Sequence, residues 1–238
     1  MLASTLERPA EARPFERKRI GPRTADLFAD RFSIAPVKTL PAKEHLFCEG
    51  DPATHVYRVE AGHIVLYRTM SDGRRQVVDF AYPGDIVGLG SLDEHGCHAQ
   101  ASTKTVVRCL PVQQIWELAA NNPRIGLKLY EAISRELTAS RELLFTVSQR
   151  TATERLAAFL IGLSNRNERR GQNPCEIVLP MTRSDIADFL GLTIETVSRT
   201  FTRFRAEGLI DLEQCILVTL RDRNLLRAIA AGEGRREH

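Results

Sequence analysis

The chain has 238 residues, of which 43% are hydrophobic, and its formal net charge is +3. A chain of this size can bury one or two hydrophobic cores, and it has no apolar run of the roughly 18–20 residues that a membrane-spanning helix needs, so we expect a soluble protein with no membrane partner. A net charge this small does not by itself indicate nucleic acid, because a local basic surface can be hidden in a nearly balanced total.

Leader peptides and disulfides are not predicted. The N-terminal residues lack an apolar core and include Glu7, Glu11 and Glu16, which argues against a signal peptide and against an acid-poor transit peptide. The five cysteines are odd in number, widely spaced and never form a C-x-x-C pair, so neither a disulfide framework nor a zinc site is expected. A reducing cytoplasm is therefore the predicted location.

Residues 1–24 contain three prolines and many charges but no sustained apolar period, so we predict a flexible N-terminal tail. A short helix near residues 25–32 is expected to lead into the first domain. The basic run at residues 17–19 is interpreted as part of the solvated tail, with a phosphate-binding arm as the alternative.

Residues 25–110 are predicted to form an antiparallel β-roll. Glycines recur there at intervals of 11 or 12 residues, at Gly50, Gly62, Gly73 and Gly84, and short β-rich runs such as HVYRV and RQVVDFAY lie between them. Turn signals at this spacing are typical of antiparallel sandwiches and barrels. The Asp-Gly pair in SDGR is a hairpin signal.

Residues 111–149 are predicted to form a long helix that restarts near 121–124. Apolar side chains recur at alternating spacings of three and four, which is the a/d pattern of a coiled coil. A helix of about 25 residues is roughly 38 Å long, so we predict a dimerisation helix; packing of the stripe on its own domain is the alternative. The predicted dimer seam consists of Tyr130, Ile133, Leu137, Ser140, Leu144 and Val147.

Residues 150–238 are predicted to form a winged helix-turn-helix, which makes the whole chain α+β. A helix with an apolar stripe comes first, and the strand-like run CEIVLP follows it. The next helix starts at Thr182, where Asp185 completes a capping-box arrangement, and Gly191 ends it. Thr193 can cap a third helix, which a β-hairpin around a Glu-Gln pair follows.

The helix predicted at residues 194–207 has two faces. At about 100° per residue, its apolar side chains fall on one face that we expect to be core: Ile194, Val197, Phe201 and Phe204. The opposite face is polar and lies toward the N-terminal end, the part of a recognition helix that enters the major groove. Its members are Glu195, Ser198, Arg199, Thr202 and Arg203.

Three residues of this polar face are predicted to read bases. Arg199 can donate two parallel hydrogen bonds to guanine, Glu195 can accept one from a cytosine amino group, and Ser198 can serve a base edge or a phosphate. Taken one at a time, these residues are equally well explained by an ordinary solvated helix face, because Glu195 in the first turn is favoured by the helix dipole and can form an ion pair with Arg199. The set as a whole favours DNA reading. Phosphate contacts are predicted at Thr182, Arg183, Thr193, Thr196 and Arg203.

The segments ERLAAFL and MTRSDIADFLGLTIETVSRTFTRF, with the glycine-spaced roll before them, resemble the CRP/FNR superfamily of bacterial transcription regulators over about residues 25–230. The resemblance implies a cyclic-nucleotide-binding-like jelly roll, a homodimer, RNA polymerase as a partner and no enzyme activity. The E-x-x-S-R pattern, here Glu195, Ser198 and Arg199, resembles the FNR and FixK branch. That implies base reading at a palindrome like TTGAT-N4-ATCAA. CRP itself has an arginine where this chain has Ile194.

The resemblance also allows the regulatory signal to be examined residue by residue. Cyclic-nucleotide binders have a Gly-Glu pair and, further on, Arg-Ser; here Leu89 follows Gly88, and HAQA stands in place of Arg-Ser. A buried cyclic phosphate would lack a cationic partner, so cyclic AMP is not expected. Residues 1–47 contain no cysteine, and Cys109 is displaced by a residue from the family's ligand position in the roll. An iron–sulfur cluster is therefore not expected either.

The compact group His95, Cys97 and His98 has soft ligands for a metal or haem, but a tight loop and the lack of a fourth ligand favour a polar loop. No cofactor and no metal are therefore expected. The FixK-like interpretation is an activator without a built-in sensor that controls microaerobic, denitrification or nitrogen-fixation genes. Thiol oxidation, synthesis or proteolysis would regulate it. Cys175 and Cys215 are the candidate redox thiols, with inertness preferred.

Two other hypotheses are kept. One is an effector-gated regulator whose β-roll binds an unidentified small ligand or haem. The other is a cupin-like metalloenzyme, which the sequence disfavours because its strands offer no convergent ligands. The hairpin near residues 72–75 is a candidate polymerase contact.

Overall fold

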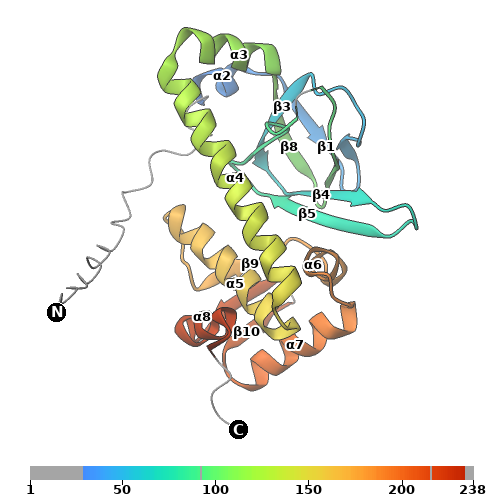
Figure 1. The fold of residues 1–238 in the computed structure, drawn as a ribbon, viewed down its shortest axis with the longest axis vertical. Coiled ribbons are helices and arrows are strands. Elements are labelled where there is room, and N and C mark those ends of the chain that lie inside the picture. Colours follow the sequence, from blue (N-terminus) through green and yellow to red (C-terminus); the bar gives the residue numbers. More distant parts are fainter. Residues whose placement is uncertain (1–28, 92, 215, 234–238) are drawn as a thin grey trace, which may run out of the picture.

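The computed structural model describes residues 29–91, 93–214 and 216–233 (Figure 1). The predicted tail at residues 1–24 and the candidate thiol of Cys215 lie outside the described residues. Figure 1 shows a β-roll at one end, a helical domain at the other, and one long helix, α4, running between them. Among the described helices, none is both long and apolar enough to cross a membrane.

The β-roll consists of two antiparallel sheets, with strand orders β1-β8-β3-β6 and β2-β7-β4-β5. The alternating apolar side chains of their inward faces form a core that includes Leu40, Val59, Ile64 and Val107. The short helix α2, Ala29–Ile34, covers one end; residues 25–28 of the helix predicted there lie outside the described residues. The strands are β1 Val37–Leu40, β2 His45–Phe47, β3 His55–Ala61, β4 Ile64–Thr69, β5 Arg75–Ala81, β6 Ile86–Val87, β7 His98–Ala101 and β8 Thr105–Pro111.

Glycine is required at two of the turns. Gly73 has a φ of +82° in the predicted hairpin between β4 and β5, where the backbone N–H of Met70 donates to the carbonyl of Arg74. A Cβ at Gly62, with a φ of +79°, would collide with the Lys104 carbonyl and the Thr105 side chain. Steric need therefore explains two members of the glycine repeat.

The connecting region consists of two helices, α3 (Val112–Asn121) and α4 (Pro123–Gln149). The break between them falls within residues 121–124, where the sequence predicted a restart. Asn122 breaks the first helix and caps the second, because its side chain accepts a hydrogen bond from the backbone N–H of Arg124 at 3.1 Å. Pro123 follows at the first position of α4, where its missing N–H costs nothing.

The C-terminal domain has a helix-turn-helix core beside a three-stranded sheet of order β10-β11-β9. Its final helix, α8, was missed in the sequence, although Asp222 caps its start and Gly232 ends it in the left-handed conformation. Leu226 and Ala230 of α8 are buried. The elements are α5 Ala152–Arg169, β9 Glu176–Val178, α6 Arg183–Leu190, α7 Ile194–Ala206, β10 Ile210–Glu213, β11 Leu217–Leu220 and α8 Arg223–Ala231.

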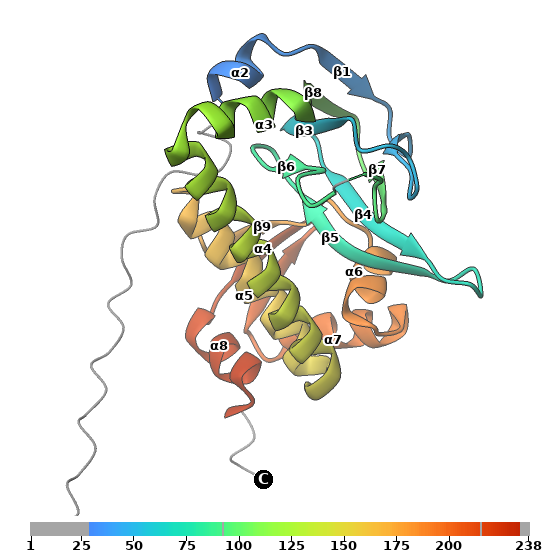
Figure 2. The same ribbon diagram turned by 45° about the horizontal axis from the view of Figure 1, so that its top comes forward.

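Part of the β-roll packs into the hydrophobic core of the C-terminal domain. Val77 and Phe80 from β5 belong to the same buried cluster as Leu160 of α5 and Ile186 of α6. Figure 2 shows β5 passing above α6, with the β4–β5 hairpin extending beyond it. The orientation of the helix-turn-helix is therefore set by packing against the roll as well as by its link to α4.

Candidate nucleic-acid interface

The turn between α6 and α7 is built from local capping interactions. The Thr182 backbone N–H donates to the Asp185 carboxylate at 2.9 Å, and the Asp185 backbone N–H donates back to the Thr182 hydroxyl at 3.1 Å, which completes the capping box. Gly191 ends α6 with a φ of 61°. Thr193 then caps α7 by accepting from the backbone N–H of Thr196 at 3.2 Å. These four signals were readable in the sequence.

The buried face of α7 is narrower than predicted. Val197, Phe201 and Phe204 are buried, but Ile194 is 46% exposed, so its assignment to the core was wrong. At about 100° per residue, Ile194 lies roughly 70° from the centre of the buried face, on its flank. Thr200 takes the opposite flank, where its buried hydroxyl donates to the Thr196 carbonyl at 2.7 Å.

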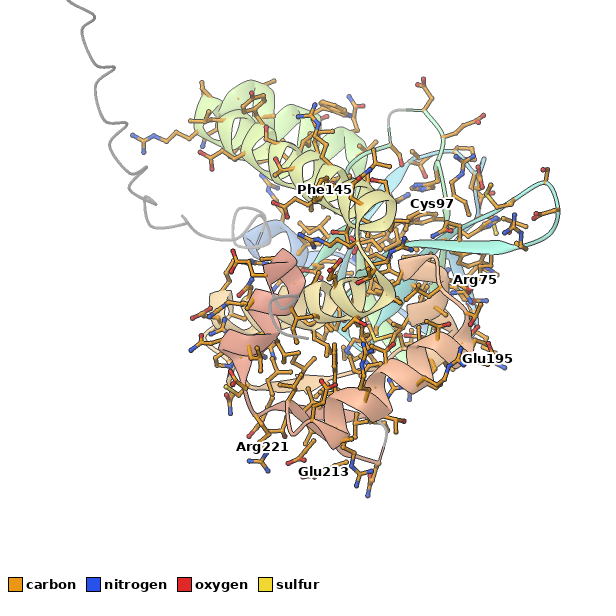
Figure 3. The ribbon with its side chains drawn as sticks, turned by 60° about the horizontal axis from the view of Figure 1, so that its bottom comes forward. Arg75, Cys97, Phe145, Glu195, Glu213 and Arg221 are labelled. Carbon is orange, nitrogen blue, oxygen red and sulfur yellow. The ribbon has the colours of Figure 1, made fainter. Side chains whose placement is uncertain are left out.

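The predicted base-reading residues Glu195, Ser198 and Arg199 all lie exposed on one side of α7, and Figure 3 shows Glu195 at the outer edge of that helix. Hydrogen bonds from its own backbone N–H and from Thr193, with the charge of Arg199 as a weaker cause, lower the pKa of Glu195. Glu195 is thus a carboxylate at neutral pH, able to accept hydrogen bonds and not to donate them.

A concave pocket of about 280 Å³ lies where α7 meets the first turn of α5. The Arg203 guanidinium donates to the Thr153 hydroxyl there, which ties α7 to the start of α5. Thr153 was not predicted as a site residue, although the capping box of Thr151 and Glu154 is visible in the motif TATE and marks a helix N-terminus. The pocket is lined by Ala152, Thr153, Thr196, Arg199, Thr200 and Arg203.

The other predicted phosphate contacts are divided between two helix starts. Thr182 and Thr193 are exposed N-caps of α6 and α7. Arg183 is half-buried, and its guanidinium carbon lies 3.8 Å from the centre of the Phe201 ring, so a cation–π contact joins the two helices. The structure therefore brings Thr196, Arg199 and Arg203 together in one pocket, whereas Thr182, Arg183 and Thr193 are not among its lining residues.

The predicted dimer seam forms an exposed apolar stripe on α4. Tyr130 is 69% exposed, Leu144 is 71% exposed, and Ile133 and Leu137 are about half exposed. Ser140 uses its hydroxyl within the helix by donating to the Glu136 carbonyl at 2.9 Å. Val147 is half-buried, and its Cγ1 lies close to Gly191. Leu127 also adds to the exposed apolar surface of α4, as does Phe145, which Figure 3 labels.

The side chains of the HGCH group turn to different partners. His95 is buried and stacks on Phe47 with ring centroids 3.5 Å apart, whereas His98 stacks on Tyr67. Burial raises the pKa of Cys97 to about 11, so its thiol stays protonated and weakly nucleophilic at neutral pH. Across the described ranges, no three metal-binding side chains come together.

The segment HAQA forms strand β7. Ala99 and Ala101 face the core of the roll and are at most 1% exposed. The positions that this strand turns inward therefore carry methyl groups and no cation for a phosphate. Cys175 is a half-buried free thiol in the loop before β9.

Comparisons with known proteins agree with this geometry. A model of the Crp-like helix-turn-helix domain matches residues 154–229, and a model of the cyclic nucleotide-binding domain matches residues 37–122. The chain is 36% identical over 178 residues to the transcriptional activator protein FnrA of Stutzerimonas stutzeri, an alignment that covers 74% of this chain and 73% of FnrA.

Two FixK proteins are also similar. The nitrogen fixation regulation protein FixK of Bradyrhizobium diazoefficiens is 38% identical over 167 residues, which is 70% of each chain. The solved structure of FixK2 from Bradyrhizobium japonicum superposes with a TM-score of 0.77 at 32% identity and covers 82% of this chain and 97% of FixK2. Such proteins are DNA-binding transcription regulators and are generally not enzymes. The chain belongs to the CRP/FNR family of transcription regulators, in its FixK-like branch.

Proposed function

We propose that this regulator is a homodimeric activator that reads a palindrome of the form TTGAT-N4-ATCAA with α7. The observation that carries the proposal is the exposed face of α7, where Glu195, Ser198 and Arg199 stand clear of the buried face. A carboxylate facing polyanionic DNA is unfavourable unless it makes a specific contact, and accepting from a cytosine amino group is such a contact. Arg199 beside it supplies the bidentate donor for guanine.

The pocket between α5 and α7 supports a phosphate contact beside the reading face. It combines two guanidinium groups, from Arg199 and Arg203, with the first turn of an α-helix. Helix N-termini favour phosphate because their backbone N–H groups and dipole point outward. We assign register-setting contacts to Thr153 together with the predicted Thr182, Arg183, Thr193, Thr196 and Arg203.

Homodimerisation through α4 is proposed from its exposed apolar stripe. Apolar side chains repeated at heptad spacing, such as Ile133 and Leu137, gain stability when a second copy of the helix covers them. A dimer related by a two-fold axis carries two copies of α7, and two half-sites of a palindrome present the major groove on one side of DNA about 34 Å apart. This geometry matches a palindromic site.

Sedimentation of the purified protein tests the dimer. We expect a dimer at micromolar concentration, and Ile133→Glu is expected to give a monomer because it places a charge in the seam. Thr138→Glu is the matched control, since Thr138 is exposed on the same helix outside the seam. If the wild-type protein is a monomer, or if both variants sediment alike, the proposed dimer interface on α4 is wrong.

The regulated genes are proposed from the relatives. By name, the relatives include transcriptional activators, an anaerobic regulatory protein and a nitrogen fixation regulation protein. We propose control of microaerobic, denitrification or nitrogen-fixation genes together with RNA polymerase. The methyl groups of Ala99 and Ala101 at the inward positions of β7 support a regulator that works without a cyclic nucleotide.

An electrophoretic shift assay with the purified apoprotein tests sequence reading. We expect tight binding to TTGAT-N4-ATCAA, weak binding to a scrambled duplex of the same composition, and no requirement for a small molecule. The assay is repeated after the protein has been treated with an oxidant, and the metal content of the purified protein is measured alongside it. Specific binding that appears only after an added effector would favour the effector-gated alternative, and equal affinity for both duplexes would overturn the proposal.

A further inference from the structure

The first helix of the helix-turn-helix is held by the β-roll at two polar points. The Arg75 guanidinium, at the start of β5, lies 3.0 Å from the Asp185 carboxylate at the start of α6. The adjacent Gln76 amide donates to the Asp188 carbonyl at 2.5 Å. Figure 3 shows Arg75 at the side of the hairpin that faces the DNA-binding domain. These contacts join residues more than 100 positions apart in the sequence.

The two carboxylate oxygens of Asp185 have different partners. Oδ2 accepts from the Thr182 backbone N–H at 2.9 Å and from its hydroxyl at 2.8 Å, which caps α6, while Oδ1 faces Arg75. Asp185 is only 7% exposed. A buried carboxylate is costly without a cationic partner, so Arg75 stabilises the same group that starts α6.

Arg75 is itself positioned by a row of side chains across one sheet of the roll, the sheet of order β2-β7-β4-β5, which we call the outer sheet. Its guanidinium carbon lies 4.2 Å from the centre of the Tyr67 ring, and His98 stacks on that ring at 4.9 Å. The Tyr67 hydroxyl is 2.8 Å from Nε2 of His45. The row crosses β2, β7, β4 and β5 in their spatial order and ends at α6.

Further contacts hold the roll to α5 and to the end of α6. Phe80 of β5 packs with Phe159 of α5 and Phe189 of α6, and Asp85 pairs with Arg166 and Arg170 of α5. These contacts can keep the two domains together without the Arg75 ion pair. Because Phe80 and Gln76 contact the last turn of α6 and Arg75 contacts its first turn, the Arg75 ion pair completes a two-point attachment that fixes the angle of α6.

We propose that Arg75 is a positioning residue for DNA reading, which sets the orientation of α7 by holding α6 against the β-roll through Asp185. The inference rests on the reading role proposed for α7. It makes the outer sheet of the roll, from His45 to Arg75, the part of that domain to which DNA recognition is coupled.

DNA affinity measured at several salt concentrations tests this role, with Arg75→Ala compared to Arg74→Ala. Arg74 is the matched control because its side chain is 80% exposed and its ion pair is with Asp72 in the same turn. We expect Arg75→Ala to weaken binding to the palindrome by about five- to tenfold, the size of a typical coupling between sites. Scrambled duplex is expected to bind as before, and Arg74→Ala to stay within about twofold of wild type.

The salt slope and a conservative variant separate positioning from other roles. Arg75 makes no phosphate contact in this proposal, so the slope of log affinity against log salt should be unchanged in Arg75→Ala. Arg75→Lys should restore most of the lost specificity because it keeps the ion pair. A shallower slope would show a direct DNA contact and overturn the proposal. An unchanged or increased affinity, or an equal loss on both duplexes, would also overturn it.

Hydrogen exchange without DNA distinguishes failure of this inference from failure of the proposed palindrome. Arg75→Ala is expected to speed exchange of the amides in α6, residues 183–190, while those of α8, residues 223–231, exchange as in the wild type. If wild-type protein ignores the palindrome but α6 still loosens, only the proposed site is wrong. If α6 exchange is unchanged, the Arg75 contact does not position the helix.

Discussion

The reading face of α7 and the junction between the roll and α5 both use arginine, in opposite ways. At the junction, Arg166 and Arg170 have side chains only 22% and 12% exposed, and both pair with Asp85. Burial, followed by the charge of Arg170, lowers the pKa of Arg166 to about 10. On α7, Arg199 is exposed and lines an open pocket with hydroxyl groups.

The difference shows how one residue type serves structure in one place and recognition in another. A buried guanidinium is costly unless a carboxylate compensates it, so the junction arginines are committed to Asp85. An exposed guanidinium costs little in the free protein and keeps its donors for a partner. Changes at the junction should therefore act on folding, whereas changes on the reading face should act on DNA binding and leave folding nearly intact.

The largest effect is expected for Asp85→Ala. This change leaves two partly buried arginines without their carboxylate and removes the acceptor for the Tyr82 backbone N–H. We expect a loss of about 2–4 kcal/mol in the free energy of unfolding. Chemical denaturation measures it. Asp72→Ala is the control, because the Asp72–Arg74 pair is exposed and should contribute little to stability. If both variants lose the same free energy of unfolding, the buried ion pairs of Asp85 contribute no more to folding than an exposed pair, and the contrast drawn above is wrong.

Arg199→Ala should give the next largest effect, and on binding alone. We expect a loss of about 1–3 kcal/mol on the matching palindrome and relaxed discrimination at one base pair. The melting temperature should stay close to that of the wild type because the side chain is exposed. Competition with palindromes changed one position at a time measures the discrimination. The same loss on scrambled DNA would make Arg199 a phosphate contact.

His63 extends the comparison to pH, because it lies beside the junction arginines. Burial, with the charges of Arg166 and Arg170 as further causes, lowers the pKa of His63 from 6.5 to about 4. The unfolded chain therefore binds more protons between these values, and stability should fall as pH drops from about 6.5 toward 4. The slope is at most about 1.4 kcal/mol per pH unit. Denaturation of His63→Gln at stepped pH should show a flatter dependence; an identical dependence would contradict this assignment.

The smallest effect is expected at the N-cap of α7. Thr193→Ala removes the hydroxyl that accepts from the Thr196 backbone N–H and should cost about 1 kcal/mol of stability. Thr202→Ala is the control on the same helix, since that hydroxyl only donates to the Ser198 carbonyl. Thermal unfolding compares the two. A greater loss for Thr202→Ala would show that capping does not define the start of α7.

Local features of the fold were predictable from the sequence because neighbouring residues create them. The hairpin glycine Gly73, the restart at Asn122 and the capping box at Thr182 each act within a few positions. The last helix, α8, was not predicted although Asp222 and Gly232 mark its ends, because a nine-residue helix owes its stability mainly to the packing of its apolar face on the rest of the domain. Ile194 was misassigned because a helical projection does not show where the covering elements end.

The sequence by itself determined the order of the two domains and the polar face of α7, on which base reading is proposed, because helical period and capping depend on residues within one or two turns. Tertiary structure alone decided which distant groups meet. It set Arg75 on Asp185, Arg203 on Thr153 and Asp85 between two arginines of α5. Each of these contacts joins segments separated by tens of residues, and no local pattern specifies the packing that brings them together.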